Sequence, residues 1–180
     1  MLPKYLGGHL NVTHIDMGAF KYLARRYQPK TFLDVGCGPG GMVRNALSYG
    51  LNAHGIDGDY TLQFKEIDDR VLVHDFTTGP CEVAPADLGW CVEFLEHIEE
   101  QFLPNVFSAL GKCNVILCTA NPTIAGHHHV NCQPQSYWIA TFSRYGFLWE
   151  EEATEHVRDC SDMVRDFARD TGLVFRKEGR

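Results

Sequence analysis

The sequence lacks any apolar run close to the roughly 20 residues that a membrane-spanning helix needs. Its first residues, MLPKYLGGHLNVTH, lack the apolar core of a secretory signal. No internal repeat, low-complexity tract or Pro/Gly/Ser-rich linker divides the chain. We therefore expect a cytoplasmic protein without a membrane partner, folded as one domain over residues 1–180.

Cysteine pairs at metal-binding spacing are also missing. The seven cysteines are an odd number, and no two of them form a Cys-x-x-Cys pair. This pattern argues against a disulfide framework and against a structural zinc site. Reduced thiols in a cytosolic setting fit it better.

Positive charge is the third scarce feature. Lysine and arginine number 16 against 23 acidic residues, which gives a formal net charge of −7. An acidic surface repels phosphate polymers, so this balance argues against a broad nucleic-acid interface. It leaves room for a local basic pocket.

The composition that remains is that of an ordinary globular protein, 44% hydrophobic and 22% charged. Predicted strands cover residues 31–35, 52–56, 70–73, 87–92, 114–119, 147–150 and 173–175. Predicted helices cover residues 16–27, 42–49, 60–67, 99–110, 135–145 and 151–170. This alternation predicts an α/β fold with a doubly wound, mostly parallel, seven-stranded sheet and helices on both faces. Residues 1–28 form an N-terminal cap and helix, and residues 30–180 the core.

A glycine-rich turn follows the first predicted strand and reads Asp34-Val-Gly36-Cys37-Gly38-Pro-Gly40-Gly41. Its glycines let the backbone turn sharply and approach a ligand, and the helix that follows offers free N–H groups. The Gly-x-Gly-x-x-Gly spacing also occurs in dinucleotide-binding proteins. Asp34 separates the two interpretations, because a carboxylate at the strand end attracts a cationic amine and repels a pyrophosphate.

Two further acidic residues follow the next two predicted strands. Asp57 ends the second strand, where a carboxylate can accept both hydrogen bonds of a ribose diol. Asp75, with Phe76 beside it, follows the third strand, where the pair can flank the edge and face of an adenine. Ligands of such sheets bind beyond the carboxyl ends of the strands, so three acids at three successive ends predict a binding site.

The segments FLDVGCGPGG, GIDGD and HDF, in this order, resemble the S-adenosylmethionine motifs of class I methyltransferases. The resemblance covers about residues 30–150 and implies a Rossmann-like methyltransferase fold with S-adenosylmethionine as the methyl donor. In that family the first acid and the glycines face the methionyl part, the second acid the ribose and the third the adenine. The cofactor-binding residues it implies are Asp34, Gly36, Cys37, Gly38, Gly40, Asp57, Gly58, Asp75, Phe76 and Glu93.

A second constellation, Glu93-Phe-Leu-Glu96-His97, follows the fourth predicted strand. The spacing i, i+3, i+4 places the three polar side chains on one face of a helical turn. Two carboxylates and an imidazole suit a hard or borderline divalent cation. The plainer interpretation is that the carboxylates bond to backbone N–H groups and that His97 packs.

Three consecutive histidines, His127, His128 and His129, stand in the loop after the fifth predicted strand. In an extended segment, alternation places His127 and His129 on one side and turns His128 away. The loops after the fourth and fifth strands are neighbours in this topology. A histidine here could therefore complete a site begun by the preceding constellation, and a polar loop without a ligand is the alternative.

The pattern E-x-x-E-H followed by a loop histidine resembles two metal-using methyltransferase branches. The ubiquinone-pathway O-methyltransferases share the first part, and the small-RNA 3′-terminal 2′-O-methyltransferases add a later histidine, matched best by His129 and second by His127. The resemblance implies Mg²⁺ or another divalent cation bound by Glu93, Glu96, His97 and His129. Because the chain is short and acidic, we expect O-methylation of a small hydroxylated molecule.

Alternatives to this expectation stay open. Without a metal, His97, His127 or His129 becomes the catalytic general base, and the acceptor is a nucleotide, a nucleic-acid end or a protein side chain. An NAD-dependent oxidoreductase is the alternative from another class, and Asp34 argues against it. The N-terminal segment around Gly7 either folds over the pocket as a cap or forms an ordered turn.

Overall fold

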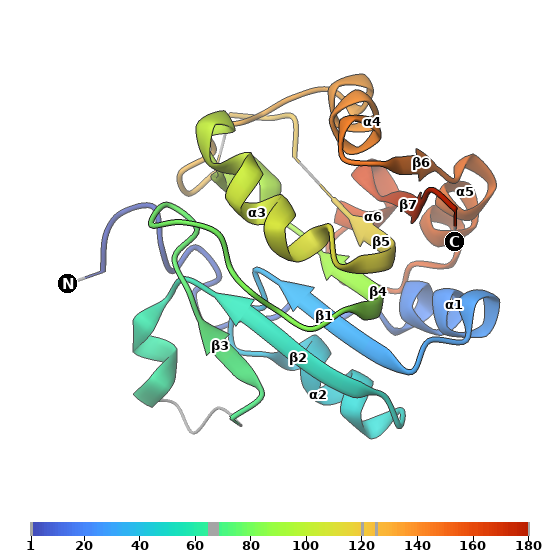
Figure 1. Ribbon diagram of the computed structural model, residues 1–180, viewed down its shortest axis with the longest axis horizontal. Coiled ribbons are helices and arrows are strands. Elements are labelled where there is room, and N and C mark those ends of the chain that lie inside the picture. The colour runs from blue at the N-terminus through green and yellow to red at the C-terminus, as the bar shows by residue number, and fades with distance from the viewer. Residues whose placement is uncertain (1, 65–68, 120, 125, 180) are drawn as a thin grey trace.

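A computed structural model describes residues 2–64, 69–119, 121–124 and 126–179 (Figure 1). Within these ranges seven strands form one sheet: β1 (Thr31–Val35), β2 (Asn52–Asp57), β3 (Val71–Val73), β4 (Ala86–Cys91), β5 (Cys113–Cys118), β6 (Phe147–Trp149) and β7 (Leu173–Lys177). Their order is β3-β2-β1-β4-β5-β7-β6. β1 to β5 pair in parallel, whereas β7 is antiparallel to both β5 and β6. The expected doubly wound, mostly parallel sheet is confirmed.

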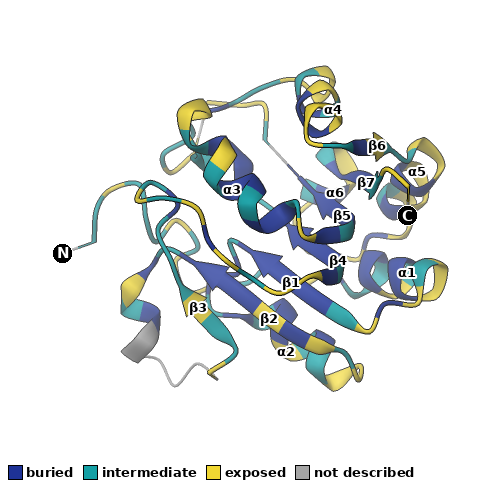
Figure 2. Cartoon of the chain, in the orientation of Figure 1, coloured by how far each residue is buried: buried dark blue, intermediate teal, exposed yellow. Residues whose placement is uncertain are grey.

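Helices cover both faces of this sheet. The α-helices are α1 (Met17–Tyr27), α2 (Gly41–Ser48), α3 (Leu103–Leu110), α4 (Gln135–Arg144), α5 (Glu151–Cys160) and α6 (Phe167–Thr171). One buried cluster joins α1, α2 and α5 to side chains such as Phe32 and Trp90. A second joins α3 and α4 to the opposite side chains of the same strands, such as Leu33 and Ile116 (Figure 2). The alternation of buried side chains along each strand therefore builds two cores, one on each face.

The predicted helix over residues 151–170 is wrong in its middle, because the chain leaves the helix after α5 and re-enters it only at α6. The cause lies at Asp16, which caps α1 through a hydrogen bond of 2.9 Å from Ala19 N. The same carboxylate accepts a hydrogen bond from the Ser161 hydroxyl and one of 3.2 Å from Asp162 N. One buried acid thus fixes the start of α1 and the end of α5.

Two other predicted helices are shorter or tighter than expected. The predicted helix over 99–110 begins as a 3-10 helix, η3 (Glu100–Phe102), before α3. The one over 60–67 is a 3-10 helix, η1 (Tyr60–Phe64), and residues 65–67 lie outside the described residues. Between β3 and β4 the described chain forms no helix. Among the described residues no helix is long and apolar enough to cross a bilayer.

The strand order reverses between β1 and β4, which are neighbours in the sheet although β2 and β3 intervene in the chain. At such a switch point the loops beyond the carboxyl ends of the two strands diverge and open a crevice. The glycine-rich turn follows β1 there, and the Glu93–His97 constellation follows β4. The fold therefore brings both sequence motifs to one edge of the sheet.

Candidate active site

The glycine turn (residues 34–41) is fixed by hydrogen bonds to β2. Gly36, Gly38 and Gly40 all have positive φ, between 49° and 81°, which a residue with a Cβ adopts at a cost. Gly36 N and Cys37 N both donate to Ile56 O, at 2.8 and 3.0 Å. A side chain at Gly36 would also overlap the ring of Phe94. The turn is therefore shaped before any ligand arrives.

Asp57, at the end of β2, holds this turn from the other side. Its Oδ2 accepts a hydrogen bond of 2.7 Å from Gly38 N, and its Oδ1 accepts one of 2.9 Å from Asp59 N. Burial nevertheless raises the pKa of Asp57 above its usual value. Each oxygen of a carboxylate has a second lone pair, so the predicted ribose contact remains available.

Asp34 is fully buried at the end of β1. Burial raises its pKa well above the ordinary value, and the nearby Asp57 carboxylate adds to the effect. A buried acid of this kind becomes a good partner once a cation lies against it. Cys37 differs from the other predicted contacts, because its Sγ packs against Gly55 of β2. Its thiol is buried beneath the turn, which leaves the backbone of Cys37 for a ligand.

Asp75, beyond β3, is half-buried and faces the N-terminal part of the chain. Its Oδ1 accepts a hydrogen bond of 2.8 Å from Thr77 N, and its Oδ2 accepts one of 2.9 Å from the Tyr5 hydroxyl. Phe76 is only 4% exposed, and its ring contacts His74 and Phe94 in edge-to-face geometry. The acid of this predicted pair is thus accessible, while the aromatic ring is packed away.

Glu93 stands at the joint between the glycine turn and the second constellation. Its backbone lies in the left-handed region, with φ of 52°, which is unusual for a residue with a side chain. Buried Thr119, after β5, fixes it twice. The Thr119 hydroxyl accepts a hydrogen bond of 2.7 Å from Glu93 N and donates one of 2.9 Å to Glu93 Oε1. Thr119 was not predicted, because a threonine at a strand end carries no signal in a single sequence.

Glu96 and His97 lie on a short 3-10 helix, η2 (Leu95–His97). Glu96 has no exposed surface, and within the described chain its carboxyl oxygens make no well-formed hydrogen bond. Weaker interactions with the Glu93 carboxyl and with the backbone of Glu96 and Asn121 still reach it. Burial raises the pKa of Glu96 well above its usual value, and the nearby Glu93 carboxyl raises it further. The plainer prediction for Glu96, bonding to backbone N–H groups, is met only by the weaker interactions with its own backbone and that of Asn121.

The histidine loop is fastened directly onto this helix. Val130 N and Asn131 N both donate to Glu96 O, at 2.9 and 3.0 Å. A side chain at Gly126 would overlap the ring of His129, so the loop closes tightly there. His129 consequently packs edge-to-face on His97, with 4.9 Å between ring centroids.

Glu96, His97 and His129 form what we call the Glu–His cluster. One ligand atom from each of the three lies within 4.8 Å of the others. His129 Nδ1 lies 2.7 Å from Thr123 O, which assigns the proton to Nδ1 and leaves Nε2 as an acceptor. Burial is the main cause that lowers the pKa of His97 to about 4, and the neighbouring His129 is the second. The His97 ring is therefore neutral at physiological pH.

The other predicted members lie around this cluster. Glu93 is outside the three-residue group, although its carboxyl is close enough to Glu96 to affect the pKa of that group. His127 is exposed, and its ring lies over Gly8 of the N-terminal segment. His128 is half-buried, with its ring 6.1 Å from that of Tyr5.

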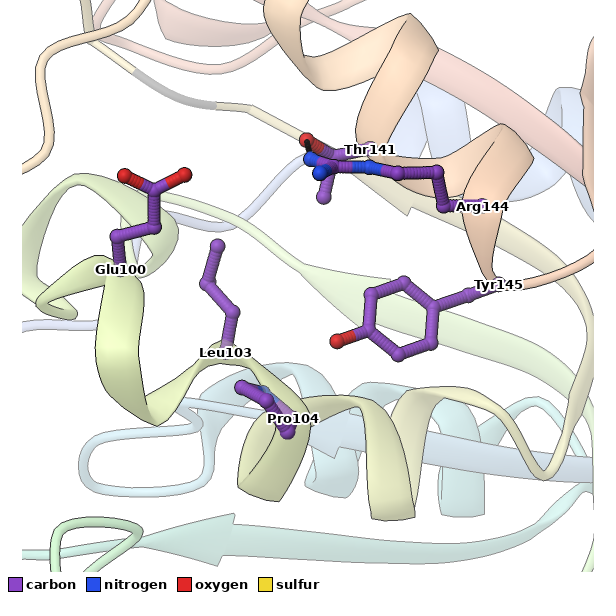
Figure 3. A pocket seen from close by; sticks show the side chains of 6 residues that line it. All are labelled: Glu100, Leu103, Pro104, Thr141, Arg144 and Tyr145. Atoms are coloured by element: carbon purple, nitrogen blue, oxygen red, sulfur yellow. Dashed lines mark hydrogen bonds between the residues drawn. The ribbon is translucent and has the colours of Figure 1, made fainter.

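Two surface pockets lie apart from the predicted residues. One of about 230 Å³ opens between η3 and α4 (Figure 3), where Glu100 and Arg144 stand on opposite sides. Its lining residues are Glu100, Leu103, Pro104, Thr141, Arg144 and Tyr145. A groove of about 380 Å³ runs over β1, β2 and β3. Residues 83–86, which lead into β4 and include its first residue, also line it. Neither pocket contains a residue of the glycine turn or of the Glu–His cluster.

Comparisons with known proteins agree with this geometry. Residues 33–117 match the family described as "Methyltransferase domain". A search of curated protein sequences gave no match. Solved structures share the fold at low sequence identity. A TehB-like SAM-dependent methyltransferase from Corynebacterium glutamicum is 17% identical with a TM-score of 0.62, over 89% of this chain and 88% of that one.

Two other similar structures point the same way. The methyltransferase domain of bacterial-CtHen1-C is 14% identical with a TM-score of 0.59, over 89% of this chain and 95% of that one. Magnesium protoporphyrin IX methyltransferase (ChlM) from Synechocystis PCC 6803, solved with bound SAM, is 12% identical with a TM-score of 0.59, over 87% and 74% of the two chains. The family match, the sheet order and these neighbours favour a methyltransferase over the NAD-dependent oxidoreductase. Over residues 33–117 the chain is similar to the methyltransferase domain family, and its fold is that of class I S-adenosylmethionine-dependent methyltransferases.

Proposed function

We propose that this methyltransferase methylates an oxygen atom of a small hydroxylated molecule with the help of a divalent cation. The observation that carries the proposal is the Glu–His cluster. A fully buried carboxyl, which makes no well-formed hydrogen bond within the described chain, lies within 4.8 Å of two imidazole nitrogens. Burial and the nearby Glu93 carboxyl raise the pKa of Glu96, and a bound cation would stabilise the charged form of this carboxylate.

The donor set fits such a cation. Glu96 offers a carboxylate oxygen, and His97 is neutral and offers a ring nitrogen. His129 offers Nε2, since its Nδ1 is bonded to a backbone carbonyl. One carboxylate and two imidazoles favour Mn²⁺, Co²⁺ or a similar borderline ion over Mg²⁺. Such a cation supplies Lewis-acid activation, which lowers the pKa of a bound hydroxyl.

The chain's own residues do the remaining work. In this proposal Asp34 faces the cationic methionyl end of S-adenosylmethionine, and Asp57 accepts from its ribose. Asp75 accepts from the adenine amine. Transfer is an in-line displacement at the sulfonium carbon, so alignment of donor and acceptor is the main task. Glu93, held by Thr119, spans the gap between the donor and the Glu–His cluster.

Binding of Mn²⁺ by calorimetry, with and without a chelator, tests the cation. We expect one ion per chain, and loss of binding in His129→Ala. His156→Ala, an exposed histidine on α5, is the matched control and should bind normally. Full methyltransferase activity in chelator, together with no bound ion, contradicts the proposal.

A metal-independent mechanism, in which a histidine acts as general base, is the second candidate. His127 is its best carrier, because it is exposed and lies outside the Glu–His cluster. His97 is a poor base, since its pKa is lowered to about 4. Activity that survives His129→Ala and is lost in His127→Ala would select this mechanism.

The acceptor is tested by a substrate panel. The net charge of −7 favours a small molecule, whereas the pattern shared with small-RNA 2′-O-methyltransferases favours a terminal ribose. Methyl transfer from labelled cofactor to catechols and sugars is compared with transfer to short RNA ends. Transfer to RNA ends alone would replace the small acceptor.

A further inference from the structure

The N-terminal segment (residues 2–15) crosses the predicted cofactor residues. His9 lies against Gly38 of the glycine turn, and Thr13 Oγ1 accepts a hydrogen bond of 3.0 Å from Gly41 N. The segment also contacts the loops after β2 and β3. It therefore covers the carboxyl ends of three strands although it belongs to none of them.

Leu6 occupies a specific place in this cover. A Cβ built at Gly58 would lie 2.6 Å from Leu6 Cδ2 and 3.8 Å from the Cα of Asp75. Gly58 directly follows Asp57, the predicted ribose acceptor, and Asp75 is the predicted adenine acceptor. The Leu6 side chain thus lies beside Gly58, next to the predicted ribose and adenine acceptors.

An adenine ring needs an apolar surface for its face as well as an acceptor for its amine. Phe76, predicted for the face, is 4% exposed and already contacts His74 and Phe94. Gly58 has no side chain to offer. Leu6 is half-buried, so its apolar side chain retains free surface at this place.

Two polar anchors hold Leu6 from both sides. Tyr5 donates to Asp75 Oδ2 at 2.9 Å, and His9 Nε2 lies 3.1 Å from Asp59 Oδ2. Asp59 is itself joined to the ribose acceptor, because its N–H donates to Asp57 Oδ1. Asp75 Oδ2 has two lone pairs and can accept from Tyr5 and from an adenine amine together.

We propose that Leu6 forms the wall against which the adenine ring of the cofactor packs, with Tyr5 and His9 as the residues that position it. This inference rests on the proposed roles of Asp57 and Asp75. It adds to the cofactor site a side chain from a segment that lies outside the matched methyltransferase domain.

Leu6→Ala tests the wall, with calorimetric affinities for S-adenosylhomocysteine and for adenosine. We expect both affinities to fall by about fivefold to tenfold, the effect of removing one apolar side chain from contact. Leu10→Ala is the matched control in the same segment, since Leu10 is 80% exposed. It should bind both ligands normally. Adenosine affinity unchanged by Leu6→Ala overturns the proposal.

Gly58→Val should change the adenosine affinity in opposite directions in the wild type and in the Leu6→Ala variant. In the wild type the new side chain collides with Leu6 and should weaken adenosine binding. In Leu6→Ala it fills the vacated space and should restore about half or more of the lost affinity. Further weakening in the Leu6→Ala background contradicts the assigned place of Leu6.

Tyr5→Phe removes one anchor and leaves the wall, so we expect a loss of about threefold for both ligands. Asp57→Ala separates this inference from the proposed function. If the wild type binds S-adenosylhomocysteine, Asp57→Ala does not, and Leu6→Ala binds normally, the role of Leu6 alone is wrong. If the wild type does not bind S-adenosylhomocysteine, or if Asp57→Ala binds it with normal affinity, both the proposed cofactor site and the role of Leu6 are wrong.

Discussion

The two halves of the site treat their buried carboxylates in opposite ways. In the cofactor half, Asp57 receives two backbone N–H groups and Asp75 receives one N–H and one hydroxyl. In the Glu–His cluster, the carboxyl of Glu96 is more deeply buried and makes no well-formed hydrogen bond among the described residues. The carboxylates of the first half have their hydrogen bonds without a ligand, whereas the Glu96 carboxyl holds its proton until a cation or another group stabilises its charged form.

Among the variants proposed here, Asp57→Ala should have the largest effect on cofactor binding. It removes the proposed ribose acceptor and leaves Gly38 N and Asp59 N without their partner. We expect S-adenosylhomocysteine affinity to fall at least about a hundredfold and stability by about 1–3 kcal/mol. Calorimetry and urea unfolding measure the two effects. Asp159→Ala, on the exposed surface of α5, is the control, and an Asp57→Ala variant with normal affinity would show that the two halves do not differ as described.

Glu96→Gln should affect the Glu–His cluster, and we expect it to change activity and the pH dependence of stability. We expect methyltransferase activity to fall about a hundredfold, because the charged ligand of the cluster is lost. In metal-free protein the same change should flatten the pH dependence of stability. The raised pKa of Glu96 means that the folded state holds its proton longer than the unfolded state. The contribution of Glu96 to wild-type stability therefore falls as pH rises above about 4.5, the ordinary glutamate value.

Melting temperatures between pH 5 and pH 8, with chelator present, check this prediction. The wild type should lose more stability over this range than Glu96→Gln does. Identical slopes for the two proteins would mean that the Glu96 carboxyl is satisfied after all.

Asp34 sharpens the comparison, because it is a buried acid in the half that is otherwise satisfied. Burial raises its pKa well above the ordinary value, and a cationic ligand should lower it again. Affinity for S-adenosylhomocysteine should therefore rise with pH above about 4, by up to about tenfold per unit, until the pKa of Asp34 in the free protein is passed. Calorimetry in two buffers of different ionisation enthalpy detects the released proton. Asp34→Asn should bind weakly and release none.

Thr119→Val tests the joint between the halves and should have the smallest effect. Loss of the hydroxyl frees Glu93 N and Glu93 Oε1, and we expect about threefold to tenfold weaker Mn²⁺ binding. Thr119→Ser keeps both hydrogen bonds and is the matched control. Equal Mn²⁺ affinity in Thr119→Val and Thr119→Ser would show that the position of Glu93 does not affect metal binding by the Glu–His cluster.

The parts of the site that were predicted lie at strand ends. Asp34, Asp57 and Asp75 each follow a short apolar run, and parallel strands bring such ends to one edge. The cluster of Glu96, His97 and His129 was predicted from spacing and topology, and the structure brings these three together.

The remaining contacts depend on backbone turns that have no periodicity in the sequence. The place of Leu6 over Gly58 follows from the left-handed turns of the N-terminal segment at Gly7, Leu10 and Asn11. The break between α5 and α6 follows from a hydrogen bond between residues 145 positions apart. Neither is encoded in a local pattern.

Glu93 has a consequence for how this sequence can vary. Its φ of 52° is a conformation that glycine adopts freely and that costs a residue with a Cβ about 1 kcal/mol. Selection for folding alone would favour glycine at this position. Under the proposed function, stability is given up at this position for a carboxylate that the reaction uses, and a lineage that lost the reaction would be free to replace Glu93 with glycine.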